Sequence, residues 1–141
     1  MLNYFAMSKT RMVSSAAALS LAAFALAVSA SDAFAFSASF HWCAGSPGFE
    51  LKDVPAGTAK LNFAMTDLNV PGFHHGGGTV AYAGATRTGE ISVPCGAFAT
   101  GFVGPSPPAG QIHTYAFTIK ALAADGAVLA TTTAQRKFPE R

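Results

Sequence analysis

The segment 104–115 combines residue types that could bind a small polar ligand. A turn with three prolines and two glycines runs directly into a predicted strand that carries His113 and Tyr115. Alternate residues of a strand face the same side, so both rings are expected on one face. Proline fixes φ and glycine permits close backbone approach, so the turn is stiff and can hold backbone groups near the two rings. The segment therefore predicts one wall of a small polar pocket.

An acid and two further histidines lie upstream, in the segment 67–75. Asp67 ends an alternating run on its apolar face, where it could orient an imidazole or cap the following turn. His75 is a candidate partner for an oxyanion, because a protonated imidazole pairs with negative charge. His74 is expected to be exposed or to lie behind the groups that touch a ligand.

These two segments together resemble motifs of the phosphatidylethanolamine-binding protein family. The segment 104–115 is similar to the family's glycine- and proline-rich motif that ends in His-x-Tyr. The segment 67–75 is similar to a shortened D-P-D-x-P motif followed by an aromatic residue and a histidine. The Ser46-Pro47 and Val54-Pro55 pairs precede them as further landmarks. The chain most resembles small secreted members of the bacterial Raf kinase inhibitor-like branch, over essentially all of residues 36–141.

The resemblance implies a non-enzymatic protein whose pocket receives a phosphate or a phospholipid head group, with no cofactor. Position by position, it selects the ligand-binding residues Asp67, His75, Gly104, His113 and Tyr115. The chain departs from the family pattern at Leu68, usually proline, at Asn69, usually a second acid, and at the triple glycine 76–78. Those glycines could open a bulge or let the backbone approach a ligand closely. The family name also implies, by analogy alone, regulation of a protein partner such as a kinase or protease.

The N-terminus has the features of a secretory signal peptide. A basic start is followed by the apolar run 13–28 and by Ala33-Phe34-Ala35, a small-x-small cleavage site. We expect cleavage after Ala35, with Ala30 as the alternative, and a periplasmic or secreted protein. An uncleaved anchor is the other possibility, and the intact mass of the exported protein distinguishes the two.

Residues 36–141 are enough for one domain and too few for two. Their pattern is alternating rather than helical and is interrupted by Gly and Pro, which predicts an antiparallel all-β domain with few or no helices. The resemblance specifies a Greek-key β-sandwich. Strands are expected at 36–42, 59–67, 79–84, 90–93, 113–121 and 127–136, turns at 45–48, 55–57 and 125–126, and core aromatic rings at Phe63, Phe98, Phe102 and Phe117.

Cys43 and Cys95 are the only cysteines, and in an exported chain they are expected to form a disulfide. Two free, buried thiols are the alternative. Without residues 1–35, seven basic and six acidic side chains remain, a net charge of about +1. Because the basic residues are scattered, the sequence argues against a nucleic-acid partner.

The same side chains suggest two other classes of function, a metal site and a hydrolase. A zinc or copper site would draw on His74, His75, His113 and Asp67. Adjacent histidines face opposite sides of an extended strand, so only one of the first pair would join such a site. A hydrolase would need a nucleophile, but neither Ser46 nor Ser106 lies in a nucleophile-elbow sequence.

Overall fold

Seven β-strands make up the part of the protein that the structure describes. The computed structural model describes residues 35–84, 90–98 and 100–140. The strands are β1 (Ser37–Cys43), β2 (Ser46–Lys52), β3 (Lys60–Asp67), β4 (Gly77–Ala81), β5 (Glu90–Val93), β6 (His113–Leu122) and β7 (Val128–Phe138). These ranges contain no helix, and so none long and apolar enough to span a membrane. The predicted signal peptide, residues 1–35, lies outside the described residues except for Ala35.

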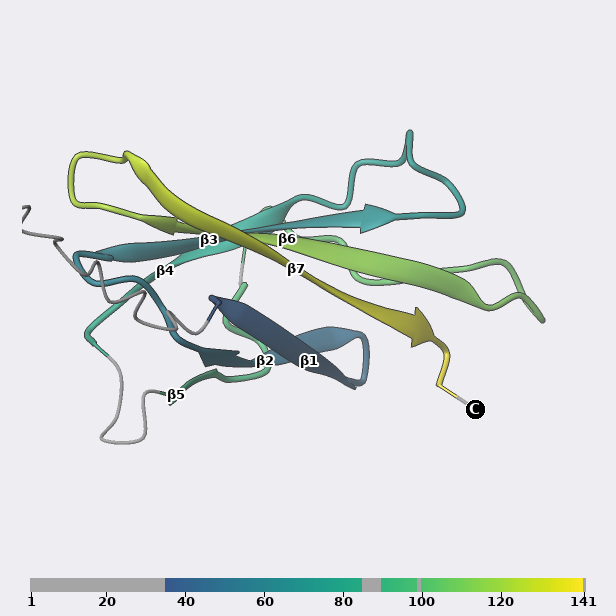
Figure 1. The fold of residues 1–141 in the computed structure, drawn as a ribbon. Coiled ribbons are helices and arrows are strands. Elements are labelled where there is room, and N and C mark those ends of the chain that lie inside the picture. The colour runs from purple at the N-terminus through teal and green to yellow at the C-terminus, as the bar shows by residue number, and fades with distance from the viewer. Residues whose placement is uncertain (1–34, 85–89, 99, 141) are drawn as a thin grey trace, which may run out of the picture. The chain divides into compact units, whose positions relative to one another are not determined.

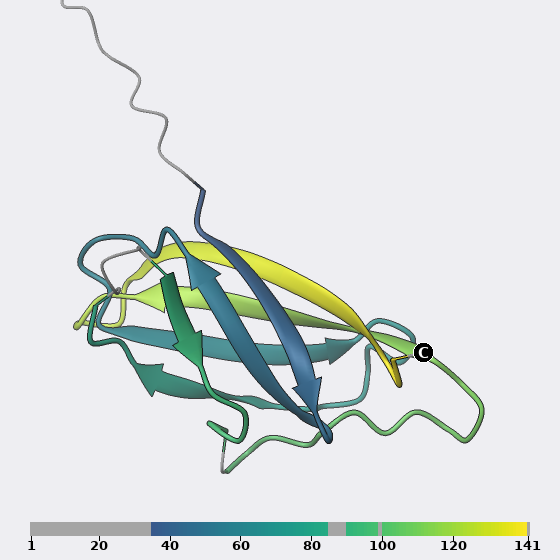
Figure 2. The same ribbon diagram turned by 90° about the horizontal axis from the view of Figure 1, so that it is seen from below.

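The strands form two antiparallel sheets that lie in separate layers (Figure 1). One sheet has the order β1-β2-β5 and the other the order β4-β3-β6-β7. Seen from below, the three-stranded sheet lies across the four-stranded one (Figure 2). Along one side β1 and β7 are joined, since Arg136 Nη1 donates to the Phe40 carbonyl over 2.8 Å and Trp42 Nε1 donates to the Lys137 carbonyl over 3.0 Å. The all-β, antiparallel prediction is confirmed, and the Greek-key connectivity stays a prediction.

The core lies between the two sheets and is built from alternate residues of their strands. In β3 the buried apolar side chains are Leu61, Phe63 and Met65, as the alternation predicts. From the facing sheet, Phe49 packs on Phe63 with ring centroids 4.7 Å apart and edge-on against Phe117 at 4.9 Å. Because these aromatic rings are removed from water on both sides, the core fixes which face of β3 and β6 points inward.

The prediction of a turn at 45–48 is wrong, because Ser46, Pro47 and Gly48 belong to β2. The hairpin turn consists of Ala44 and Gly45 alone, and both have positive φ, 51° and 89°. Two such residues match the twist of the strands that they connect. Proline is tolerated in β2 at this position because β5 pairs with β2 only from Phe49 onward.

The predicted disulfide between Cys43 and Cys95 is confirmed. It links the end of β1 to the segment after β5 and spans 52 residues of sequence, with the two Cα atoms 6.1 Å apart. That separation is in the usual range for a disulfide. The bond therefore connects both outer strands of the three-stranded sheet.

Candidate functional site

A pocket opens where β3 ends and β6 begins. These strands are antiparallel neighbours, and the last residue of β3, Asp67, lies opposite Tyr115. The loops 68–76 and 104–112 therefore leave and enter the sheet at the same end (Figure 1). They enclose a cavity of about 190 Å³ lined by Asp67, Val70, Phe73, His75, Ser106, Pro108, His113 and Tyr115. The fold thus brings together the two segments that the sequence singled out.

Asp67 and His113 form a buried pair at this strand end. His113 Nδ1 donates to Asp67 Oδ2 over 2.6 Å, and the two residues are only 5% and 4% exposed. Asp67 Oδ1 accepts the backbone N–H groups of Asn69 and Val70 over 2.8 and 3.2 Å. Asp67 therefore fills both of the roles considered for it, orienting an imidazole and capping the next turn.

The protonation of Asp67 follows from these contacts. Burial opposes ionisation of the carboxyl, but the hydrogen bonds from His113, Asn69 and Val70 outweigh it and hold its pKa below the ordinary 3.8. Asp67 is thus a carboxylate whose oxygens are occupied by protein donors. It positions its neighbours and offers little to a cation.

Tyr115 is fully buried beside this pair. Burial, and next the negative charge of Asp67, raise the pKa of the Tyr115 phenol above its ordinary 10. The hydroxyl therefore stays protonated, and it interacts with the Asp67 carboxylate and the Ser106 backbone. The ring meets His75 edge-on, with centroids 5.4 Å apart. Tyr115 thereby contacts both segments that form the pocket, 67–75 and 104–112.

His75 differs from His113 in what its ring nitrogens contact. His75 Nδ1 donates to the Val103 carbonyl over 2.8 Å, and the Val103 N–H donates back to the His75 carbonyl, also over 2.8 Å. His75 is 3% exposed and lines the cavity, and its Nε2 has no hydrogen-bond partner among the described residues. In His113, by contrast, Nε2 lies 3.1 Å from Gln111 Oε1. His75 is therefore the imidazole with a nitrogen left for a ligand.

Gly104 is the one predicted site residue that does not line the cavity. A Cβ atom at this position would lie 2.8 Å from the Gly45 carbonyl oxygen. Its lack of a side chain is required by packing of the 104–112 loop on the β1–β2 turn. His74 is exposed, as expected, and does not line the cavity either.

Sequence reasoning assigned no ligand-facing role to Val70, Ser106 or Pro108, which the structure places in the cavity wall. Asn69, where the family usually has a second acid, does not line the cavity. Its Oδ1 accepts the Thr114 N–H over 2.8 Å and so links the segments 67–75 and 104–115. All of these residues lie within the segments 67–75 and 104–115. The motif segments therefore indicated this part of the pocket, although no single residue type did.

The three glycines 76–78 approach other protein groups rather than the cavity. Gly76 forms a bridge with Phe102, Gly77 pairs with Ala64, and a Cβ atom at Gly78 would lie 2.3 Å from the Phe98 ring. The fourth strand accordingly begins at Gly77 instead of the expected residue 79. The glycines therefore let the backbone of 76–78 lie directly against β3 on one side and the 100–103 segment on the other.

Gly77→Ala is expected to lower the free energy of unfolding by about 3 kcal/mol, at the upper end of the usual cost of overpacking. A Cβ atom there would lie 1.8 Å from the Phe63 carbonyl oxygen, and backbone atoms cannot rotate away as a side chain can. Urea unfolding measures the loss. Gly72→Ala is the matched control, since nothing lies within 4 Å of its Cβ position. Equal stability of the two variants would contradict the close approach.

The two sheets, with a pocket at one end of the four-stranded sheet, define a small all-β protein over the described residues. Comparison with known families matches residues 29–139 to the family described as phosphatidylethanolamine-binding protein. The chain belongs to this family, whose members generally bind anionic ligands and are not catalysts. No curated protein and no solved structure matches the chain significantly.

Proposed function

We propose that this protein is an exported, non-enzymatic binding protein whose cavity takes a small anionic group, a phosphate or a phospholipid head group. The observation that carries the proposal is His75, which lines the cavity and whose Nε2 has no hydrogen-bond partner among the described residues. The other imidazole and the acid satisfy one another. When the His75 ring is protonated, an incoming anion therefore meets an N–H at Nε2 rather than a free carboxylate.

The same contact predicts how binding depends on pH. Because His75 Nδ1 already donates to the Val103 carbonyl, Nε2 carries a proton only when the ring is an imidazolium. An anion favours that form, so anion binding is linked to proton uptake and the affinity rises as pH falls. Ser106 supplies a second hydrogen-bonding group in the cavity wall.

Titration with inorganic phosphate and, separately, with phosphorylethanolamine tests the proposal by NMR of the histidine rings. We expect His75 to respond at millimolar ligand, more strongly than His113, with tighter binding at pH 5.5 than at pH 8. Phosphate alone is sufficient if the pocket recognises the free anion, whereas a clear preference for phosphorylethanolamine indicates a lipid head group.

Variants separate binding at the cavity from weak surface binding. His75→Gln is expected to weaken phosphate binding at least tenfold, and the exposed neighbouring His74→Gln serves as its control. Ser106→Ala tests the cavity wall without altering a buried group. The proposal fails if neither ring responds, or if His74→Gln loses as much affinity as His75→Gln.

Neither of the two serines considered as a nucleophile is hydrogen-bonded to a base among the described residues. Ser46 Oγ accepts the Gly96 N–H over 2.7 Å, in the three-stranded sheet, and does not line the cavity that contains His113. Ser106 lies in the cavity wall but makes no hydrogen bond from its hydroxyl to an imidazole among the described residues. Neither serine is paired with a base as an activated nucleophile requires.

A further inference from the structure

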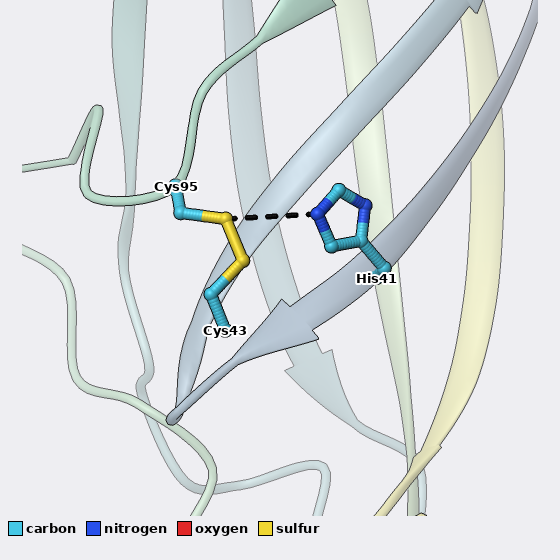
Figure 3. A group of neighbouring side chains, drawn as sticks. All are labelled: His41, Cys43 and Cys95. Carbon is cyan, nitrogen blue, oxygen red and sulfur yellow. Dashed lines mark hydrogen bonds between the residues drawn. A yellow bond between two sulfur atoms is a disulfide. The ribbon is translucent and has the colours of Figure 1, made fainter.

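A second group of chemically reactive side chains lies on the three-stranded sheet, apart from the residues that line the cavity. His41 Nε2 lies 3.7 Å from Cys95 Sγ, and Cys95 is bonded to Cys43 (Figure 3). The three potential ligand atoms lie within 4.8 Å of one another. Of the residues that the structure describes, this is the only set of three or more such side chains gathered closely enough for a metal ion.

The backbone is shaped to hold His41 against the cysteines. His41 lies opposite Gly48 in the β1–β2 ladder. A Cβ atom at Gly48 would lie 2.8 Å from His41 Cε1 and 2.9 Å from Cys95 Sγ. Only glycine therefore lets the imidazole and the sulfur meet across β2. His41 and Cys95 are both exposed, so the group can be reached from solvent.

We propose that, when the disulfide is reduced, Cys43, Cys95 and His41 bind a zinc ion. Zinc lies about 2.3 Å from a thiolate sulfur and about 2.0–2.1 Å from an imidazole nitrogen, which at a tetrahedral angle separates the two ligand atoms by about 3.6 Å. The 3.7 Å between His41 Nε2 and Cys95 Sγ matches that separation. Water completes the four ligands, as in other sites with three protein ligands.

Reduction of the disulfide and binding of zinc are two separate steps. A dithiol, small or protein-borne, transfers two electrons and two protons to the Cys43–Cys95 disulfide and becomes a disulfide itself. Zinc then binds the two cysteine sulfurs, and both thiol protons pass to solvent. In the reverse direction a disulfide accepts two electrons and becomes a dithiol, the Cys43–Cys95 bond re-forms and the ion is released, so the site exists only in the dithiol state.

The test uses the purified protein, with the disulfide intact or reduced by a phosphine under anaerobic conditions. Zinc is titrated against a chromophoric chelator, and cobalt is used in parallel for its thiolate charge-transfer absorption. We expect one zinc per reduced chain and none per oxidised chain. A reduced protein that retains no zinc after desalting overturns the proposal.

Variants decide whether the imidazole is a ligand. His41→Ala is expected to weaken zinc binding at least tenfold, while the exposed His74→Ala leaves it unchanged. Gly48→Ala removes no ligand but displaces the His41 ring, so it too is expected to weaken binding. If His41→Ala binds zinc as tightly as the unaltered protein, the two thiols act alone and the three-residue site is refuted.

Discussion

Asp67→Ala is expected to lower the free energy of unfolding by about 3–5 kcal/mol at pH 7, because each buried donor left without its acceptor costs about 1–3 kcal/mol. The substitution leaves His113 Nδ1 and the N–H groups of Asn69 and Val70 without their acceptor. It also removes the carboxylate that interacts with the Tyr115 hydroxyl. Urea unfolding of the two proteins measures the difference, and the His75 response to phosphate is expected to weaken with it.

The pH dependence of the stability difference between the unaltered protein and Asp67→Ala tests whether the ionised carboxylate is the cause. The folded-state pKa of Asp67 lies below 3.8, so its stabilising effect is complete above the unfolded-state pKa and is lost as pH falls through the folded-state value. The advantage of the unaltered protein over Asp67→Ala should therefore be constant from pH 7 to about pH 5 and shrink below about pH 4. A difference that persists undiminished to pH 2 would contradict a role for the ionised carboxylate.

Asp125→Ala is the matched control for these measurements. Asp125 is an exposed acid in the β6–β7 turn, and its Oδ1 accepts the Ala127 N–H over 3.0 Å. Its removal should cost no more than about 1 kcal/mol, because water replaces a partner at an exposed site. The contrast separates the loss of a buried, multiply bonded carboxylate from the loss of any negative charge.

The alternating strands could be predicted because burial of one face leaves a direct trace in the sequence. Phe63 and Met65 in β3, and Phe117 and Ile119 in β6, recur at every second position for that reason. The same alternation placed Asp67 on the inward face. The start of β2 left no such trace, since residues 46–48 are of types usually found in turns, and the alternation of buried Phe49 and Leu51 begins only after them.

The arrangement inside the pocket depended on contacts that no local pattern encodes. The orientation of His75 is set by Val103, 28 residues away, through two reciprocal hydrogen bonds. Gly104 was expected at the pocket, but its packing against Gly45 follows from the meeting of two distant turns. The contact of His41 with Cys95 could not be predicted either, because it depends on Gly48 in the neighbouring strand.

The double variant C43S/C95S is expected to lower the free energy of unfolding by about 4 kcal/mol on the chain-entropy account of cross-links. The disulfide spans 52 residues of sequence, so its loss greatly enlarges the conformational freedom of the unfolded chain. Denaturant unfolding of the oxidised protein and the double variant measures the effect. The unaltered protein in phosphine should match the double variant, and unchanged stability on reduction would contradict the prediction.

Denaturant unfolding of the reduced protein with and without zinc also tests the proposed metal site. A ligand that binds only the folded state stabilises it by RT ln(1 + [L]/Kd), about 2.7 kcal/mol at a concentration of 100 Kd. Added zinc should therefore restore much of the stability of the reduced protein and none of that of C43S/C95S. Reduced His41→Ala should recover less at the same zinc concentration, because the imidazole no longer contributes to holding β1 beside the segment after β5.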